Sequence, residues 1–257
     1  MFDFHSLRKW KWPQPLTKPM VMVDGVAVSP RSGTKVVGAS AFVCTVNEKN
    51  FAKVISMLDV EALYIYEARV SSIESIGNLS RLKHLKIDWA TKFDDLTPLT
   101  RLTQVESLHL EHTTRVEDLD PIRHLKRLRS FGFEGGINVR ATAKSLLPIA
   151  ELEFLEDVIL TNLKVLEGGL RPLARCKSLK ELIVSQQFGW RDYAYLAAKL
   201  PHVDCDKFKP WTRYDKEFVM LTGTPGGLVH WIADYKRVEA HEKRFLAYKD
   251  KCMAPGD

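Results

Sequence analysis

Two segments of the sequence hold residue types that bind metal ions or activate a nucleophile. His109 and His112 enclose Leu110 and Glu111, and imidazole together with carboxylate is a common set of zinc ligands. The surrounding residues alternate as in a strand, where residues three apart point to opposite faces, so the two rings diverge. We therefore predict no metal site in this chain.

Cys205, His202 and Asp204 together have the residue types of a thiol nucleophile and its base. Strand alternation separates them, because Cys205 takes a position that faces the core while the other two face outwards. The expected role of Cys205 is that of a buried structural thiol.

The turn from Gly223 to Gly227 is glycine-rich but lacks the Lys-Ser/Thr pair that a phosphate loop requires. The sequence also holds no dinucleotide fingerprint, nucleophile motif or zinc signature. We predict a protein that is not an enzyme and that needs no cofactor.

The composition is that of a folded protein, since 257 residues with 45% hydrophobic and 27% charged content can bury a core. The net charge of +6 suits an acidic partner, although net charge governs weak association rather than fold. No apolar run has the length of a signal peptide or of a membrane span of about 20 residues. The four cysteines are scattered, which predicts reduced thiols and a cytoplasmic location; they are Cys44, Cys176, Cys205 and Cys252.

The pattern L-x-x-L-x-L recurs seven times and would form a short strand each time. Its middle residues are separated by 22, 23, 23, 27, 24 and 21 positions. The seven copies are Val60-x-x-Leu63-x-Ile65, Leu82-x-x-Leu85-x-Ile87, Val105-x-x-Leu108-x-Leu110, Leu128-x-x-Phe131-x-Phe133, Leu155-x-x-Val158-x-Leu160, Leu179-x-x-Leu182-x-Val184 and Leu200-x-x-Val203-x-Cys205.

Between these strands the apolar residues recur at every third position, as in Val70, Ile73, Ile76 and Leu79. This spacing suits a tight 3₁₀ return, and stacked units bury the apolar side that no unit can hide alone. An ordinary α/β domain is the alternative, but its crossovers need about a dozen residues or more, and these returns are barely that long. The pattern predicts an α/β solenoid, a curved parallel sheet with short helical returns.

The segment from about Val60 to Asp206 resembles the leucine-rich repeats of bacterial internalins and of the phosphatase-regulatory class. One departure is consistent, because the position three residues after the last strand leucine holds no asparagine, which puts regular curvature in doubt. We expect the longest step to hold a longer convex helix within RATAKSLLPIAELEFL, residues 140–155. The residues in place of asparagine are Ala90, Thr113, Gly136, Leu163 and Gln187.

Capping elements are expected at both ends, because the terminal cores of a solenoid would otherwise face water. Residues 1–59 would form β segments and a capping helix, residues 60–206 the repeats, and residues 207–257 a hairpin and a helix. The run from Arg8 to Trp12 alternates cations with tryptophan. We interpret it as capping core, with contact to nucleic acid or membrane as the alternative.

Strand alternation also assigns a concave surface, which consists of the residues before, between and after the strand leucines. Acidic residues are frequent there, aromatic rings come early, and two isoleucines expected to be exposed come late. We predict that this surface binds a partner through Tyr64, Tyr66, Asp88, His109, Glu111, Glu134, Asp157, Ile159, Glu181 and Ile183.

Asp88, Glu111 and Glu134 should stand in one row about 4.8 Å apart, where like charges repel by roughly 1 kcal/mol per pair. A net positive chain that gathers acids on one face points to a basic protein or peptide as its partner, whereas a solvated face without a ligand is the alternative. We interpret the chain as a monomeric binding scaffold, and a toxin-neutralising, immunity-like protein is one form of it.

Basic residues fall instead on the segments that lead into the strands, and they would form a lateral stripe. Such a stripe can bind phosphates, which is the rival function of nucleic-acid or acidic-partner binding. Cations at the ends of short helical returns also complement the helix dipole, and we favour this structural role. The stripe consists of Arg81, Lys83, Arg101, Arg123, Lys126, Arg127, Arg175 and Lys177.

Overall fold

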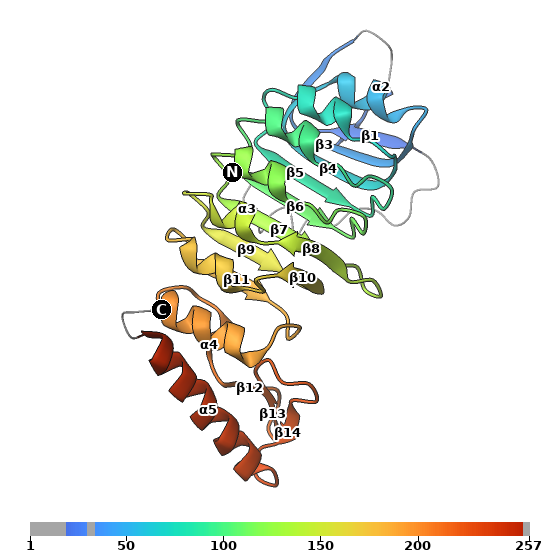
Figure 1. Ribbon diagram of the computed structural model, residues 1–257. Helices are drawn as coiled ribbons and strands as arrows, with labels where there is room; N and C mark the ends of the chain where they lie inside the picture. The colour runs from blue at the N-terminus through green and yellow to red at the C-terminus, as the bar shows by residue number, and fades with distance from the viewer. Residues whose placement is uncertain (1–18, 30–33, 254–257) are drawn as a thin grey trace.

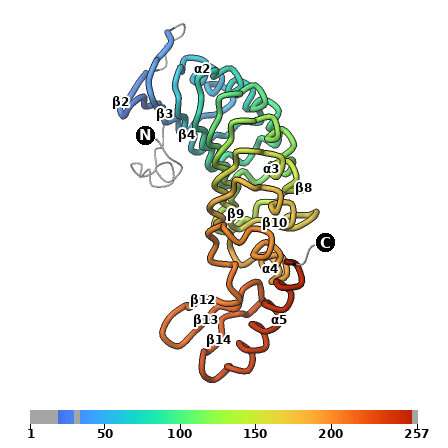
Figure 2. The backbone as a smooth tube through the Cα atoms, turned by 90° about the vertical axis from the view of Figure 1, so that its left-hand side faces the viewer, coloured from blue at the N-terminus to red at the C-terminus, as the bar shows by residue number. Residues whose placement is uncertain are grey.

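The computed structural model describes residues 19–29 and 34–253, which form a curved stack of strands and short returns (Figures 1 and 2). Within these residues the largest sheet has nine strands in the order β11-β9-β7-β6-β5-β4-β3-β1-β2. Its strands are β1 (Met20–Val23), β2 (Val26–Ala27), β3 (Val36–Asn47), β4 (Leu58–Arg69), β5 (His84–Asp88), β6 (Ser107–Glu111), β7 (Ser130–Glu134), β9 (Asp157–Leu160) and β11 (Glu181–Val184).

Four of the returns are 3₁₀ helices of five residues each, as the three-residue spacing predicted. Most of them carry proline in the first turn, where its missing N–H costs no hydrogen bond. Each turns the chain back towards the next strand while burying its apolar residues. They are η1 (Glu74–Asn78), η2 (Thr97–Arg101), η3 (Asp120–His124) and η4 (Arg171–Arg175).

The register of the parallel strands follows the repeat. Leu63 pairs with Leu85, Leu85 with Leu108, and the series continues through Phe131 and Val158 to Leu182. All of these side chains are buried in one continuous core. The predicted fold, a leucine-rich-repeat solenoid, is confirmed. The seventh copy of the pattern is the exception, because it forms only an isolated bridge between Glu181 and Asp204 and not the predicted strand.

The sheet begins before the first predicted repeat strand. Strand β3 is parallel to β4 and aligns Ala41 with Leu63, and α2 (Phe51–Ser56) connects the two strands. On the other edge β1 runs antiparallel to β3. Asp24, in the turn after β1, accepts hydrogen bonds from Ser40 of β3, which anchors the turn. The parallel stack therefore extends one strand further towards the N-terminus.

The predicted convex helix within residues 140–155 is wrong. Its first part is a strand, β8 (Ala141–Ser145), and only α3 (Leu147–Ala150) is helical. Ala141 and Ala143 are buried while Lys144 is exposed, and β8 pairs in parallel with β10 (Leu163–Glu167). Pairing with another strand outweighs the helix propensity of the alanines.

The C-terminal part begins with α4 (Trp190–Lys199), a helix that replaces the short return of the other units. After η5 (Asp206–Phe208) come the antiparallel strands β12 (Trp211–Arg213), β13 (Phe218–Leu221) and β14 (Leu228–His230). The helix α5 (Tyr235–Met253) packs against α4 and buries Phe245 in the main core. No described helix is long and apolar enough to cross a membrane.

Candidate functional site

The predicted acidic row exists in the register of the sheet. Asp88 at the end of β5 pairs with Glu111 of β6, which pairs with Glu134 of β7. The preceding residue of β5, Ile87, is fully buried, because its side chain lies on the opposite side of the sheet. The three carboxylates therefore stand side by side on the concave face of the sheet.

Each carboxylate of the row is bonded diagonally by a side chain from the middle of the preceding strand. The Tyr64 hydroxyl donates to Asp88 over 3.1 Å, and the Lys86 ammonium donates to Glu111 over 3.0 Å. His109 Nε2 lies 2.7 Å from Glu134 Oε1. These contacts offset the repulsion that was predicted for an unopposed row, so the row costs less stability than its formal charges imply.

Asp88 differs from the other two acids in its surroundings. It is 7% exposed, and burial together with the nearby Glu111 carboxylate raises its pKa from 3.8 to about 7. The Lys86 ammonium and the Tyr64 hydroxyl act against this rise in the pKa. Near neutral pH the row therefore carries less than three full negative charges.

Glu134 is held from both sides, since its second carboxylate oxygen accepts a hydrogen bond from the Thr161 hydroxyl.

Nitrogen or oxygen atoms of His109, Glu111 and Glu134 lie within 4.8 Å of one another, so the three offer a candidate ligand set for a divalent ion. The Lys86 ammonium on Glu111 opposes a cation there. The predicted absence of a metal stays a prediction.

Aromatic rings line the concave face beside the acids. The ring of Tyr66 lies 6.3 Å from that of Trp89, which lies 4.8 Å from the imidazole of His112. Trp89 is 49% exposed, although alternation after Asp88 would place it on the core side. Its backbone φ of 55° is left-handed and turns the side chain outwards.

Sequence reasoning missed Trp89 for this reason, yet a signal existed. Glu67, within β4, and His112, after β6, occupy the same register position as Trp89 and also have positive φ values. Polar residues recurring at a position that alternation assigns to the core indicate that the alternation ends there.

Much of the predicted surface is not freely accessible. Tyr64, Asp88, His109 and Glu134 are buried, and the late residues are at most partly accessible. Asp157 pairs in register with Glu181, and both acids are half-buried. Ile183 is half-buried as well, but Ile159 is 2% exposed, so its predicted role as an exposed anchor is wrong. Alternation decides the side of the sheet on which a residue lies, whereas accessibility depends on the tertiary surroundings.

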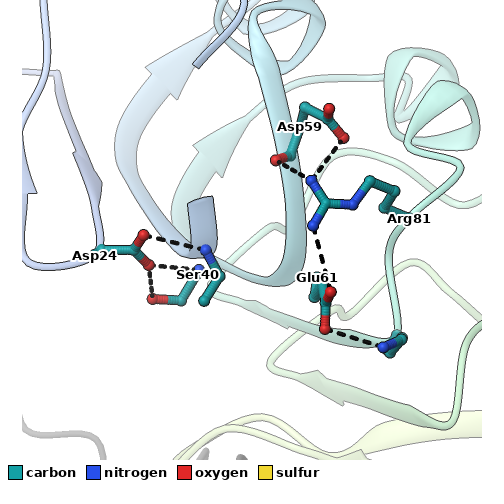
Figure 3. A network of polar contacts seen from close by, with 7 residues as sticks. Asp24, Ser40, Asp59, Glu61 and Arg81 are labelled. Carbon is teal, nitrogen blue, oxygen red and sulfur yellow. Dashed lines mark hydrogen bonds and ion pairs between the residues drawn. The ribbon is translucent and has the colours of Figure 1, made fainter. Parts of the chain in front are cut away.

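Half of the basic stripe is paired with acids. Arg81 lies between the carboxylates of Asp59 and Glu61, at 3.5 and 3.3 Å (Figure 3). Lys83 also binds Glu61, and these two cations hold the pKa of that carboxyl below its usual range. Further along, Arg101 binds Glu74 and Arg123 binds Asp120. These ion pairs favour a structural role over phosphate binding for the four paired cations, Arg81, Lys83, Arg101 and Arg123.

The reactive residue types considered in the sequence do not form a catalytic group. Cys205 is buried with a pKa raised to about 12 by burial, while His202 and Asp204 are exposed. All four cysteines are buried free thiols, so Cys205 has the surroundings of a structural residue. The run from Arg8 to Trp12 lies outside the described residues.

Among solved structures the chain is similar to proteins of the same repeat class. Internalin C2 of Listeria monocytogenes is 16% identical, with 63% of this chain and 68% of that chain covered and a TM-score of 0.46. A second internalin of that organism is also 16% identical, with 67% and 51% covered and a TM-score of 0.46. A leucine-rich-repeat protein of Leptospira interrogans is 13% identical, with 60% and 50% covered and a TM-score of 0.34. The chain is a leucine-rich-repeat solenoid by its own register.

No protein-family model matches the sequence, and a search of curated proteins found no match.

Proposed function

We propose that this chain is a non-enzymatic scaffold that binds a basic protein or peptide on its concave face. Repeat solenoids generally bind proteins on such extended concave surfaces. The diagonal contacts between neighbouring strands support the proposal. In these contacts side chains from the middle of the preceding strands hold the carboxylates of Asp88, Glu111 and Glu134 in place. Carboxylates fixed before binding lose little conformational freedom when a cationic partner arrives.

The accessible part of the face has the chemistry of a cation site. The Glu111 side chain is 36% exposed, and Asp157 and Glu181 are half-buried further along the sheet. The exposed ring of Trp89 lies at the same strand end as Glu111 and can stack on a lysine or arginine side chain. Acids with an aromatic platform favour an arginine- or lysine-rich segment over an acidic partner.

The test measures binding of a synthetic peptide of alternating lysine and glycine by surface plasmon resonance. Replacing Glu111→Gln and Glu181→Gln should slow association about tenfold at low salt, because the field that steers a cationic partner is weakened. The matched control removes the same charge at Glu117 and Glu153, which are exposed and lie outside the strands of the sheet. Glu117→Gln with Glu153→Gln should leave association unchanged, and equal losses in both variants would contradict the proposal.

A second variant separates steering from anchoring. Ile183→Ala should mainly speed dissociation, because a half-buried apolar contact acts after encounter. Ile159→Ala would not report on anchoring, since Ile159 is buried and its truncation would change stability.

The rival function, nucleic-acid or acidic-partner binding, is tested on the basic stripe. Arg123→Gln with Arg127→Gln should leave peptide binding unchanged. Binding of duplex DNA is measured for the parent chain and for this variant. If the parent chain binds DNA more tightly than the peptide, and the variant loses DNA binding, the rival function replaces the proposal.

We propose that the biological role of this face is to neutralise a basic toxin in the cytoplasm. One monomer of this chain would cover one toxin molecule. It requires a one-to-one complex with a basic protein. Light scattering on the captured partner measures this ratio, and any higher stoichiometry contradicts it.

A further inference from the structure

A hollow of about 650 Å³ lies between η4 and α4, and its lining is strongly basic. Four cations line it, from Arg171, Arg175, Lys177 and Lys199, against the single carboxylate of Glu167. Figure 2 shows α3, β10 and α4, which contribute to this lining, on the side of the tube away from the sheet strand β9. The hollow is therefore separate from the concave face.

Two of the cations are positioned by an aromatic ring and a hydroxyl. The guanidinium of Arg171 lies 5.2 Å from the centre of the Tyr195 ring, and the Lys199 ammonium lies 5.9 Å from the same ring. Arg171 also donates to the Tyr248 hydroxyl over 3.1 Å. Asp192, at 3.8 Å, offsets part of the Arg171 charge, and the remaining cations still outnumber the acids. Cations held in this way lose little freedom when they bind an anion.

The hollow also has an apolar part. Leu147, Pro172 and Ala174 contribute to its lining, and Leu147 is exposed. Its volume lies within the range of about 300 to 1,000 Å³ that is typical of small-molecule sites. Cations bind the oxygens of phosphate groups, while the apolar part can hold carbon atoms.

We propose that this hollow binds a small organic molecule that carries two or more phosphate groups. Several cations converging on one hollow suit a multivalent anion, since each phosphate oxygen then meets its own donor. The site stands independently of the concave face and of the partner that binds there.

The test is titration calorimetry of the whole chain with adenosine triphosphate and with inorganic pyrophosphate as probes. Replacing Arg175→Gln and Lys199→Gln should weaken both affinities about tenfold or more, because two charge-assisted contacts are lost. The control Arg191→Gln with Lys236→Gln removes the same charge at exposed positions outside the lining. This control should leave both affinities unchanged.

Lys199 is half-buried, so Arg175→Gln with Lys177→Gln serves as a second variant at two exposed positions. Leu147→Ser should weaken binding of the nucleotide but not of pyrophosphate, which has no organic part. The proposal is overturned if the parent chain binds neither probe, or if the control loses as much affinity as the lining variants. It is also overturned if duplex DNA displaces the nucleotide at equal phosphate concentration, because the hollow would then be part of a nucleic-acid surface.

Discussion

The imidazole ring of His109 packs against Gly132, its register partner on the next strand. A Cβ atom on Gly132 would come within 2.7 Å of ring atom Cδ2. From this place His109 Nε2 reaches Glu134 at 2.7 Å. The absence of a side chain at Gly132 is therefore what allows the diagonal contact between β6 and β7.

Gly132→Ala should displace the His109 ring and lower the free energy of unfolding by about 1 to 3 kcal/mol, the usual cost of overpacking. Chemical denaturation measures the change. Gly189→Ala is the control, because no atom lies within 4 Å of a Cβ there and its φ is −71°. A Gly132→Ala protein as stable as this control would contradict the packing of His109.

Leu108→Ala should lower the free energy of unfolding by about 2 to 5 kcal/mol, because it leaves a cavity in the core. Leu108 is 0% exposed and has leucine and phenylalanine as its partners in the register. The exposed Leu166 provides the matched control, for which Leu166→Ala should change little. The transition should stay single, since neighbouring units complete each other's core.

Asp88 should make stability depend on pH. Its pKa is raised from 3.8 to about 7 on folding. The contribution of Asp88 to the free energy of unfolding is therefore fully present below about pH 4 and is lost as pH rises through 7. Asp88→Asn removes this titration. The stability of the variant relative to the parent should therefore increase between about pH 4 and 7, by up to about 1.4 kcal/mol per pH unit. A constant difference over this range would show that Asp88 ionises normally.

The cysteine thiols should be unreactive in the folded protein. Burial raises the pKa of Cys176 and of Cys205 to about 12, and all four cysteines are buried. At about pH 8 a thiol reagent should modify them slowly in the native state and rapidly in denaturant, because the thiolate is the reactive form. An internal disulfide found by mass analysis under non-reducing conditions would contradict both this prediction and the expected reducing compartment.

The repeat made most of the solenoid predictable. Its apolar positions identified the strand residues Leu63 to Leu182, and the three-residue spacing identified the 3₁₀ returns. Alternation also placed Asp88, Glu111 and Glu134 in a single row. Segments without the repeat were less predictable, as β8 shows, because its alternating residues are small alanines and lie outside the leucine pattern that identified the other strands.

The sequence by itself determined which residues share the concave face, because side chains alternate along a strand whatever surrounds it. Only the tertiary structure decided what those residues do there. Tyr64 and Lys86 became partners of acids on the next strand, Ile159 became buried, and the left-handed turn at Trp89 brought an unpredicted ring to the surface. Diagonal contacts and burial depend on distances between residues more than 20 positions apart in the sequence, and these distances are set only when the units stack. The side to which Trp89 points depends on its backbone angle, which strand alternation does not give.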